Sequence, residues 1–138
     1  MGAFDKIYEG NFWGFGSGHG SLPAVTRGYR DFIEKFLQAN KIRSVVDYGC
    51  GDWQFSRLID WKGAHYTGLD IAKKVIESNN QKYASGDVEF LAIEPSDNEI
   101  PSADLLITKD VLQHLTRNEI ERFLRQCLKK NPGVLLET

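Results

Sequence analysis

The chain has 138 residues, of which 41% are hydrophobic and 26% are charged, and its 17 basic and 19 acidic side chains give a net charge of -2. This length and apolar content are enough for one domain with a buried core and too small for two ordinary domains. The charge balance excludes a general basic field for nucleic acid, so a nucleic-acid partner would need a local patch.

Neither a membrane partner nor a disulfide is expected. No apolar run approaches the roughly 20 residues that span a bilayer, and the N-terminus lacks the basic-then-apolar order of a signal peptide. The two cysteines, Cys50 and Cys127, fall in a predicted turn and a predicted helix far apart in the sequence. This usage favours free thiols in a reducing cytoplasm.

Residues 1–22 alternate aromatic residues with glycines and show no helical or strand period, which predicts a loop or flexible arm. One interpretation is a terminal leader that packs a few aromatic rings on the core. The other is a lid over a ligand, in which Trp13 and Phe15 exclude water. Both stay open, and the domain proper is expected to span residues 23–138.

From Ser21 to Asn40, apolar residues recur at helical spacing and predict an amphipathic helix. Pro23 is tolerated in the first turn of such a helix. The apolar face consists of Val25, Tyr29, Phe32, Ile33, Phe36 and Leu37.

A strand over residues 42–48 leads directly into a glycine turn. Its valines suit a parallel strand that is covered on both faces. Gly49 and Gly51 allow the backbone to turn sharply and let a ligand approach the main chain. We expect a helix from Asp52 to Asp60, burying Phe55 and Leu58, whose N-terminal amides face the same opening and favour a polar or anionic group.

The rest of the chain alternates apolar strands with amphipathic helices. The further strands are expected at residues 65–70, 88–93 and 103–108 and from residue 134 onward. A helix that follows Asp70 is expected to end at residues 78–80, and a short helix is expected around residues 111–115. Thr116 and Glu119 match a capping box, which predicts a last helix that ends before Pro132.

This alternation predicts a Rossmann-like, doubly wound parallel sheet of about five strands in three α/β/α layers. Ligands of such sheets lie beyond the carboxyl ends of the strands, where the winding reverses. Four residues lie at or just after predicted strand ends and are expected to converge there: Gly49, Asp70, Glu94 and Asp110.

The acid at the end of the second strand suits a nucleoside. Asp70 follows Gly51 by nineteen residues, about the spacing at which a carboxylate accepts both ribose hydroxyls. The alternative is that Asp70 caps the next helix and Asp47 only braces the turn. In the turn Gly49-Cys50-Gly51-Asp52-Trp53-Gln54 a large side chain fills the third small position of a dinucleotide site, and Asp52 adds negative charge. The turn therefore favours a cofactor without phosphates over a dinucleotide.

These residues resemble a known family. VVDYGCGDW and YTGLDIA are similar to the first two motifs of class I S-adenosylmethionine-dependent methyltransferases, and VEFLAIE and ADLLITKDVLQHL resemble the third and fourth. The resemblance covers residues 24–138. The family sheet has seven strands with a C-terminal antiparallel hairpin, whereas this chain stops at the fifth, so we expect an exposed sheet edge that favours a homodimer or marginal stability.

The resemblance implies S-adenosyl-L-methionine as cofactor and S-adenosyl-L-homocysteine as product. The two turn glycines would approach the methionine part, Asp47 its amino group, Asp70 the ribose and Glu94 the adenine, while Lys109 would border the sulfonium. No metal is expected. The predicted cofactor-binding residues are Trp13, Asp47, Gly49, Cys50, Gly51, Asp70, Ile71, Glu94 and Lys109.

Methyl transfer from a sulfonium mainly requires orientation and a dry site. If the acceptor must lose a proton, the candidate catalytic residues are Asp110 and His114, which are four residues apart on one helical face, with His19 as a further base. In the alternative interpretation, Asp110 caps a helix and His114 packs in the core.

Three functions remain open. The first is a methyltransferase that acts on a small molecule, which suits an acidic chain without a basic groove. The second is a non-catalytic S-adenosylmethionine-binding module. The third, disfavoured by the glycine pattern, is an NAD-dependent oxidoreductase.

Overall fold

The computed structural model describes residues 27–94, 100–108, 115–130 and 134–137. Strands and helices alternate along most of this part of the chain, as the sequence predicts. The elements are α2 (Arg27–Asn40), β1 (Ser44–Tyr48), the 3-10 helix η2 (Ser56–Leu58), β2 (His65–Asp70), α3 (Lys73–Tyr83), β3 (Val88–Ala92), β4 (Leu105–Thr108), α4 (Arg117–Lys130) and β5 (Val134–Glu137).

Several sequence predictions lie outside the described residues. They are the N-terminal arm with Trp13 and the short helix after β4 with Lys109, Asp110 and His114. These predictions stay as they were stated.

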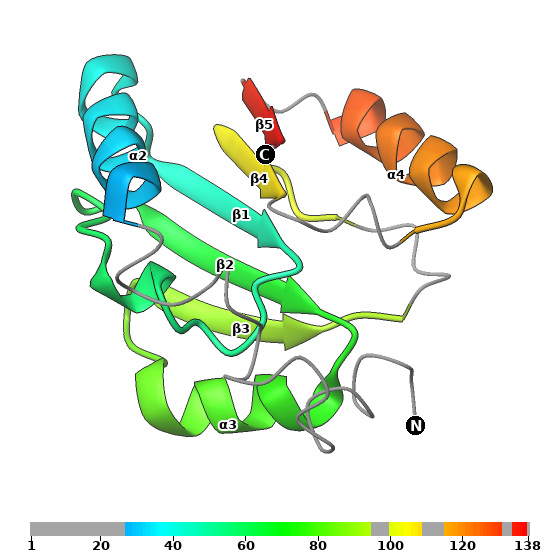
Figure 1. Ribbon diagram of the computed structural model, residues 1–138, viewed down its shortest axis with the longest axis horizontal. Helices are drawn as coiled ribbons and strands as arrows, with labels where there is room; N and C mark the ends of the chain where they lie inside the picture. Colours follow the sequence, from blue (N-terminus) through cyan, green and yellow to red (C-terminus); the bar gives the residue numbers. More distant parts are fainter. Residues whose placement is uncertain (1–26, 95–99, 109–114, 131–133, 138) are drawn as a thin grey trace.

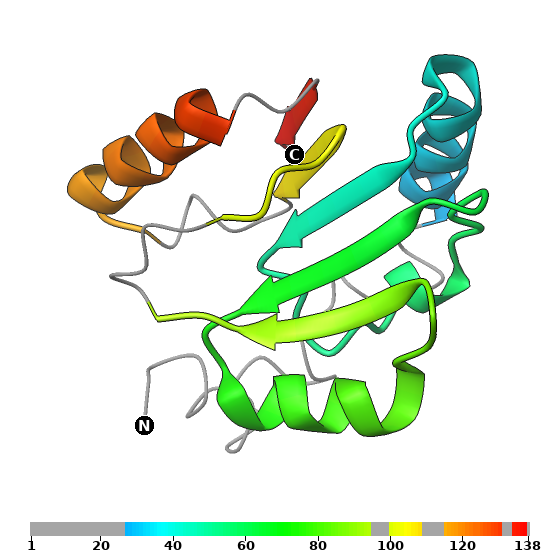
Figure 2. The ribbon, with the colours of Figure 1, turned by 180° about the vertical axis from the view of Figure 1, so that it is seen from behind.

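The five strands form one parallel sheet in the order β3-β2-β1-β4-β5 (Figure 1). The chain winds outward from β1 to β3 and then returns to the other side of β1 with β4, so the winding reverses between β1 and β4. Figure 2 shows the same strand directions from behind. The predicted doubly wound sheet is confirmed.

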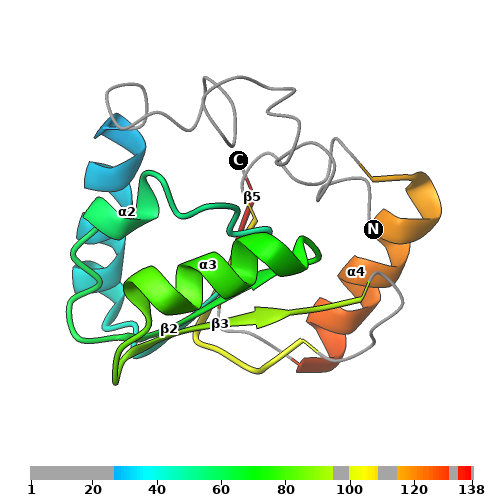
Figure 3. The same cartoon turned by 90° about the horizontal axis from the view of Figure 1, so that it is seen from below.

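Two buried clusters lie on the two faces of the sheet. Alternate strand residues such as Val45 and Tyr66 pack with Ile33 and Leu37 of α2 and Ile76 of α3. Their sequence neighbours form the second cluster, which includes Val46, Leu69, Leu106 and Phe123 of α4. Helices therefore cover both faces, and α3 packs along β2 and β3 (Figure 3).

Helix α2 confirms the predicted amphipathic pattern over its described part. Ile33 and Leu37 are buried, but Phe32, which the pattern places on the apolar face, is half exposed and packs beside Phe36. At the other end of the chain, the predicted capping box is also present. The Thr116 N–H donates to Glu119 Oε1 at 3.0 Å, and the Glu119 N–H donates to Thr116 Oγ1 at 3.2 Å.

The helix predicted from Asp52 to Asp60 is wrong. Only the single 3-10 turn η2 forms there, and Leu58 is exposed rather than buried. Trp53 has a φ of 61° and its buried indole packs on Tyr66 and Phe90 with ring centroids 5.3 and 5.1 Å away. A residue in the left-handed region interrupts a right-handed helix, so burial of this indole prevails over local helix propensity.

Helix α3 is longer than predicted and continues through Asn79 and Asn80 to Tyr83. Asparagine usually ends helices because its side chain bonds the nearby backbone instead. Here both amides bond partners outside the helix: Asn79 Nδ2 donates to Gly51 O at 2.8 Å, and Asn80 Nδ2 donates to Phe90 O at 2.9 Å. Because these amides bond to residues outside the helix, they do not compete for the backbone hydrogen bonds of α3.

Candidate functional site

The glycine turn follows the carboxyl end of β1 and is hydrogen-bonded to the carboxyl end of β2. Gly49 and Gly51 have φ values of 84° and 59°, a region that glycine enters without steric cost. The N–H groups of Gly49 and Cys50 both donate to Leu69 O, at 2.7 and 3.0 Å. The turn is therefore held against β2 by main-chain hydrogen bonds.

Asp70 lies beside this turn, as its sequence spacing predicts. The carboxylate is buried, with 8% of the residue exposed. Its Oδ2 accepts the Gly51 N–H at 2.9 Å, and its Oδ1 accepts the Ala72 N–H at 3.0 Å. A carboxylate offers about four acceptor positions, and these two bonds use one on each oxygen. They fix the plane of the carboxylate relative to the turn.

The alternative role of Asp70 as a helix cap holds only in part. Helix α3 begins at Lys73 after Ala72, and the N-cap residue makes no side-chain cap bond. The bond from the Ala72 N–H to Asp70 instead orders the chain as it enters the helix. Asp70 thus connects the glycine turn with the start of α3.

Asp47 is buried in β1, where its Oδ2 accepts a hydrogen bond from the Tyr66 hydroxyl at 2.6 Å. Burial and the Asp47 carboxylate raise the pKa of Tyr66 well above its ordinary value, so the phenol stays protonated and remains a donor. This bond links β1 to β2, whereas the alternative interpretation had Asp47 brace only the turn.

Cys50 lies in the turn as a buried, free thiol. Burial raises its pKa well above the ordinary value, and the Asp70 and Asp47 carboxylates raise it further. The thiol is therefore protonated and a poor nucleophile. The two buried carboxylates also place negative charge close to the turn.

Gly68 is a site residue that the sequence analysis missed. A Cβ at this position would lie 2.8 Å from Phe90 Cδ1, 3.0 Å from Cys50 Sγ and 3.1 Å from Cys50 Cβ. Glycine at Gly68 thus leaves room for the turn to lie over β2. A glycine inside an apolar strand is the sequence signal that could have indicated this close approach.

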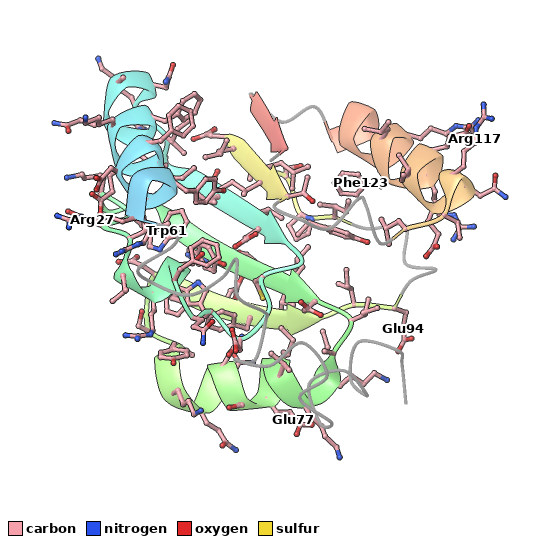
Figure 4. The ribbon with its side chains drawn as sticks, in the orientation of Figure 1. Arg27, Trp61, Glu77, Glu94, Arg117 and Phe123 are labelled. Carbon is pink, nitrogen blue, oxygen red and sulfur yellow. The ribbon has the colours of Figure 1, made fainter. Side chains whose placement is uncertain are left out.

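The two other predicted cofactor-binding residues in the described part of the chain, Ile71 and Glu94, lie farther along the chain from the glycine turn. Ile71 is half-buried directly after Asp70, and Glu94 follows β3 at the carboxyl edge of the sheet. Glu94 is exposed and forms an ion pair with Lys73, with 2.9 Å between Nζ and Oε1; Figure 4 shows it beyond the end of β3. Within the described ranges no group of three His, Cys, Asp or Glu residues could hold a metal ion, and no helix there combines the length and apolar character of a membrane span.

Solved structures share this fold at low sequence identity. The methyltransferase domain of bacterial CtHen1 has a TM-score of 0.67 at 16% identity, over 78% of this chain and 63% of that one. Magnesium protoporphyrin IX methyltransferase from Synechocystis PCC 6803, with bound SAH, has a TM-score of 0.63 at 20% identity, over 91% and 64%. Human N-acetylserotonin methyltransferase in complex with SAM has a TM-score of 0.62 at 19% identity, over 79% and 32%.

The chain thus spans less than two thirds of the length of each of these three proteins. A search of curated proteins found no match. A family model described as a methyltransferase domain matches residues 46–131, which is more than half of the chain. The chain therefore belongs to the methyltransferase domain family.

Proposed function

We propose that this chain binds S-adenosyl-L-methionine at the glycine turn and transfers its methyl group to a small-molecule acceptor. The observation that carries the proposal is the contact between Asp70 and the turn. The strand-end carboxylate accepts the Gly51 N–H at 2.9 Å although nineteen residues separate the two in sequence. A preorganised acid beside a glycine turn suits the ribose of a nucleoside.

The charge at the turn supports this cofactor over a phosphate-bearing one. Asp47 and Asp70 raise the pKa of Cys50 through their negative charge, and Asp52 adds a third carboxylate near the thiol. A sulfonium and an ammonium group are stabilised by such a potential, whereas a pyrophosphate is repelled. The missing helix after Gly51 also removes the N-terminal amides that hold a pyrophosphate in dinucleotide sites.

In methyl transfer the protein need not form a covalent bond to the substrate, and it mainly orients the cofactor and the acceptor. When bound, the cofactor supplies a methyl group on a sulfonium sulfur, which keeps the bonding electron pair as the acceptor attacks. In this proposal Asp70 orients the ribose, and the turn glycines let the methionine part approach the main chain. Asp110 and His114 stay predicted bases for acceptors that lose a proton.

A small-molecule acceptor agrees with the net charge of -2 and with the absence of a general basic field. Two of the similar structures are enzymes named for small molecules, N-acetylserotonin and magnesium protoporphyrin IX. A non-catalytic binding module would use the same cofactor contacts, so only turnover separates the two functions. A cytoplasmic location stays a prediction from the cysteine usage.

Calorimetry with S-adenosylhomocysteine tests the cofactor site. Loss of a hydrogen bond to a charged group costs about 1.5–3 kcal/mol, so Asp70→Ala should weaken binding by about tenfold or more. Asp87→Ala, which removes the same charge from the exposed loop before β3, is the control and should bind like the wild type. Equal affinity of the Asp70 variant and the wild type, or tighter binding of NADH, would contradict the proposal.

Turnover is measured as formation of S-adenosylhomocysteine from S-adenosylmethionine with a panel of hydroxyl- and amine-bearing small molecules. Cofactor binding without turnover on any acceptor would favour the non-catalytic module.

We also propose that the chain self-associates along β5, which lies at the end of the described sheet and pairs with β4. Sedimentation velocity should then show a concentration-dependent dimer, and a stable monomer at all concentrations would refute it.

A further inference from the structure

Asn79 is a buried polar residue on the side of α3 that faces the sheet. Only 2% of it is exposed, and it lies one helical turn after the buried Ile76. Its Nδ2 donates to Gly51 O at 2.8 Å across twenty-eight residues of sequence. An apolar side chain would ordinarily occupy such a position, because burying an amide costs free energy unless it is bonded.

Gly51 is held on both of its peptide groups. Its N–H donates to Asp70 Oδ2 and its carbonyl accepts from Asn79, while the Cys50 thiol makes a longer contact of 3.6 Å with the same carbonyl. Glycine has more accessible backbone conformations than any other residue, so a φ of 59° at Gly51 is selected by these bonds rather than by its own preference. The orientation of the Gly51 N–H in turn fixes the carboxylate of Asp70.

We infer that Asn79 is a positioning residue for cofactor binding, which acts on the ligand through Gly51 and Asp70 without contacting it. The inference rests on the proposed function, because it assumes that the turn and Asp70 hold the cofactor. Asn79 then provides rigidity before the ligand arrives, and its loss lowers affinity by letting the turn and the carboxylate sample other orientations.

The neighbouring Asn80 provides a matched control. It lies on the same helix and its amide makes two hydrogen bonds, from Nδ2 to Phe90 O at 2.9 Å and from the Phe90 N–H to Oδ1 at 3.2 Å. These bonds tie α3 to β3 and do not touch the turn. Asn79→Ala and Asn80→Ala therefore each remove an asparagine amide from α3, but only the first releases Gly51.

The first measurement needs no ligand. Amide hydrogen exchange of Gly51 is followed by NMR in both variants, and the rates are corrected for the change in global unfolding free energy. Asn79→Ala should raise the corrected exchange rate of Gly51 at least fivefold, and Asn80→Ala should leave it within twofold of the wild type. Equal rates in the two variants would overturn the inference.

The second measurement is the Kd for S-adenosylhomocysteine. Asn79→Ala should weaken binding five- to tenfold and Asn80→Ala less than twofold. Asn79→Asp adds a pH test: its carboxylate cannot donate to the Gly51 carbonyl, whereas the protonated acid can. Because position 79 is buried, the pKa of the introduced carboxyl group is raised, and the acid takes up its proton as the pH is lowered from 8 to 5. The Kd ratio of Asn79→Asp to the wild type should therefore fall over this range, and a constant ratio would count against the positioning role.

The two measurements separate the two claims. Suppose that the wild type does not bind S-adenosylhomocysteine, but the amide exchange rate of Gly51 rises in Asn79→Ala and not in Asn80→Ala. The proposed function then fails, and the control of the turn by Asn79 holds. If the wild type binds and the two alanine variants behave alike, the inference fails and the proposed function holds.

Discussion

Gly68→Ala is the sharpest test of how the glycine turn packs on the sheet. The added Cβ would lie 2.8 Å from Phe90 Cδ1 and 3.0 Å from Cys50 Sγ, whereas carbon atoms pack best about 3.5–4.0 Å apart. Strand β2 cannot retreat, because it is bonded to β1 and β3 on its two sides. Phe90 is itself buried against Trp53, so its ring cannot move away from the added Cβ without disturbing that packing.

Overpacking of this kind costs about 1–3 kcal/mol, and we expect Gly68→Ala to lower the free energy of unfolding by that amount. The assay is urea denaturation followed by tryptophan fluorescence, with the midpoint shifted and the slope unchanged. Because Cys50 belongs to the turn, the variant should also bind S-adenosylhomocysteine more weakly than the wild type.

Alanine substitutions at two other glycines separate the steric effect of an added Cβ from the effect of backbone strain. A Cβ added at Gly63 would meet open space, but the φ of this residue is 78°, so Gly63→Ala should cost about 1–2 kcal/mol from strain alone. Gly86 has open space and no left-handed φ, so Gly86→Ala should be neutral or stabilise by about 0.4–1 kcal/mol. If Gly68→Ala proved as stable as Gly86→Ala, the close packing of the turn on β2 would be refuted.

Three further predictions concern buried or capping groups. Tyr66→Phe keeps the ring but removes the 2.6 Å bond to Asp47, so it should cost about 1.5–3 kcal/mol in denaturant melts; a change below about 0.5 kcal/mol would contradict this bond. Because burial raises the folded-state pKa of Cys50 from its ordinary value of 9.0, the stability that the protonated thiol contributes is fully present below pH 9 and is lost as the pH rises through the raised pKa. Iodoacetamide should accordingly label the Cys50 peptide at pH 8 only as fast as the protein unfolds, by mass spectrometry. Bonds from Thr116 lower the pKa of Glu119 from 4.5, so the stability that its carboxylate contributes is fully present above pH 4.5 and is lost as the pH falls through the lowered pKa. Glu119→Ala, which removes the carboxylate that accepts the Thr116 N–H, should then cost about 1 kcal/mol at pH 7 and less at pH 3, and a pH-independent cost would argue against that half of the capping box.

The sequence analysis found the parts of the site that depend on local patterns. Gly49, Gly51 and Asp70 stand out because a glycine turn follows one apolar strand and an acid ends the next. The structure brings Gly51 and Asp70 to within a hydrogen bond of one another. The alternation of strands and helices likewise led to the correct fold class, a doubly wound parallel sheet.

The supports of the site were not found in this way. Asn79 and Tyr66 each act on a residue that is distant in sequence, and nothing in their immediate neighbours distinguishes them from a helix-breaking amide and a core aromatic residue. Gly68 does carry a sequence signal, as a glycine inside an apolar strand, but only the structure identifies Phe90 and Cys50 as the residues that it approaches. The predicted helix after Gly51 failed for the same reason, because Trp53 takes its conformation from Tyr66 and Phe90.

By itself, the sequence determined the parallel αβ layers, the glycine turn, the acid at the end of the second strand and the capping box of the last helix. Each of these follows from side-chain size, periodicity or backbone freedom within a few residues. Only the tertiary structure decided that Asn79 and Asp70 hold Gly51 from its two sides and that Trp53 prevents a helix. Those outcomes depend on contacts made across the sheet, where burial and distant hydrogen-bond partners prevail over local conformational preference.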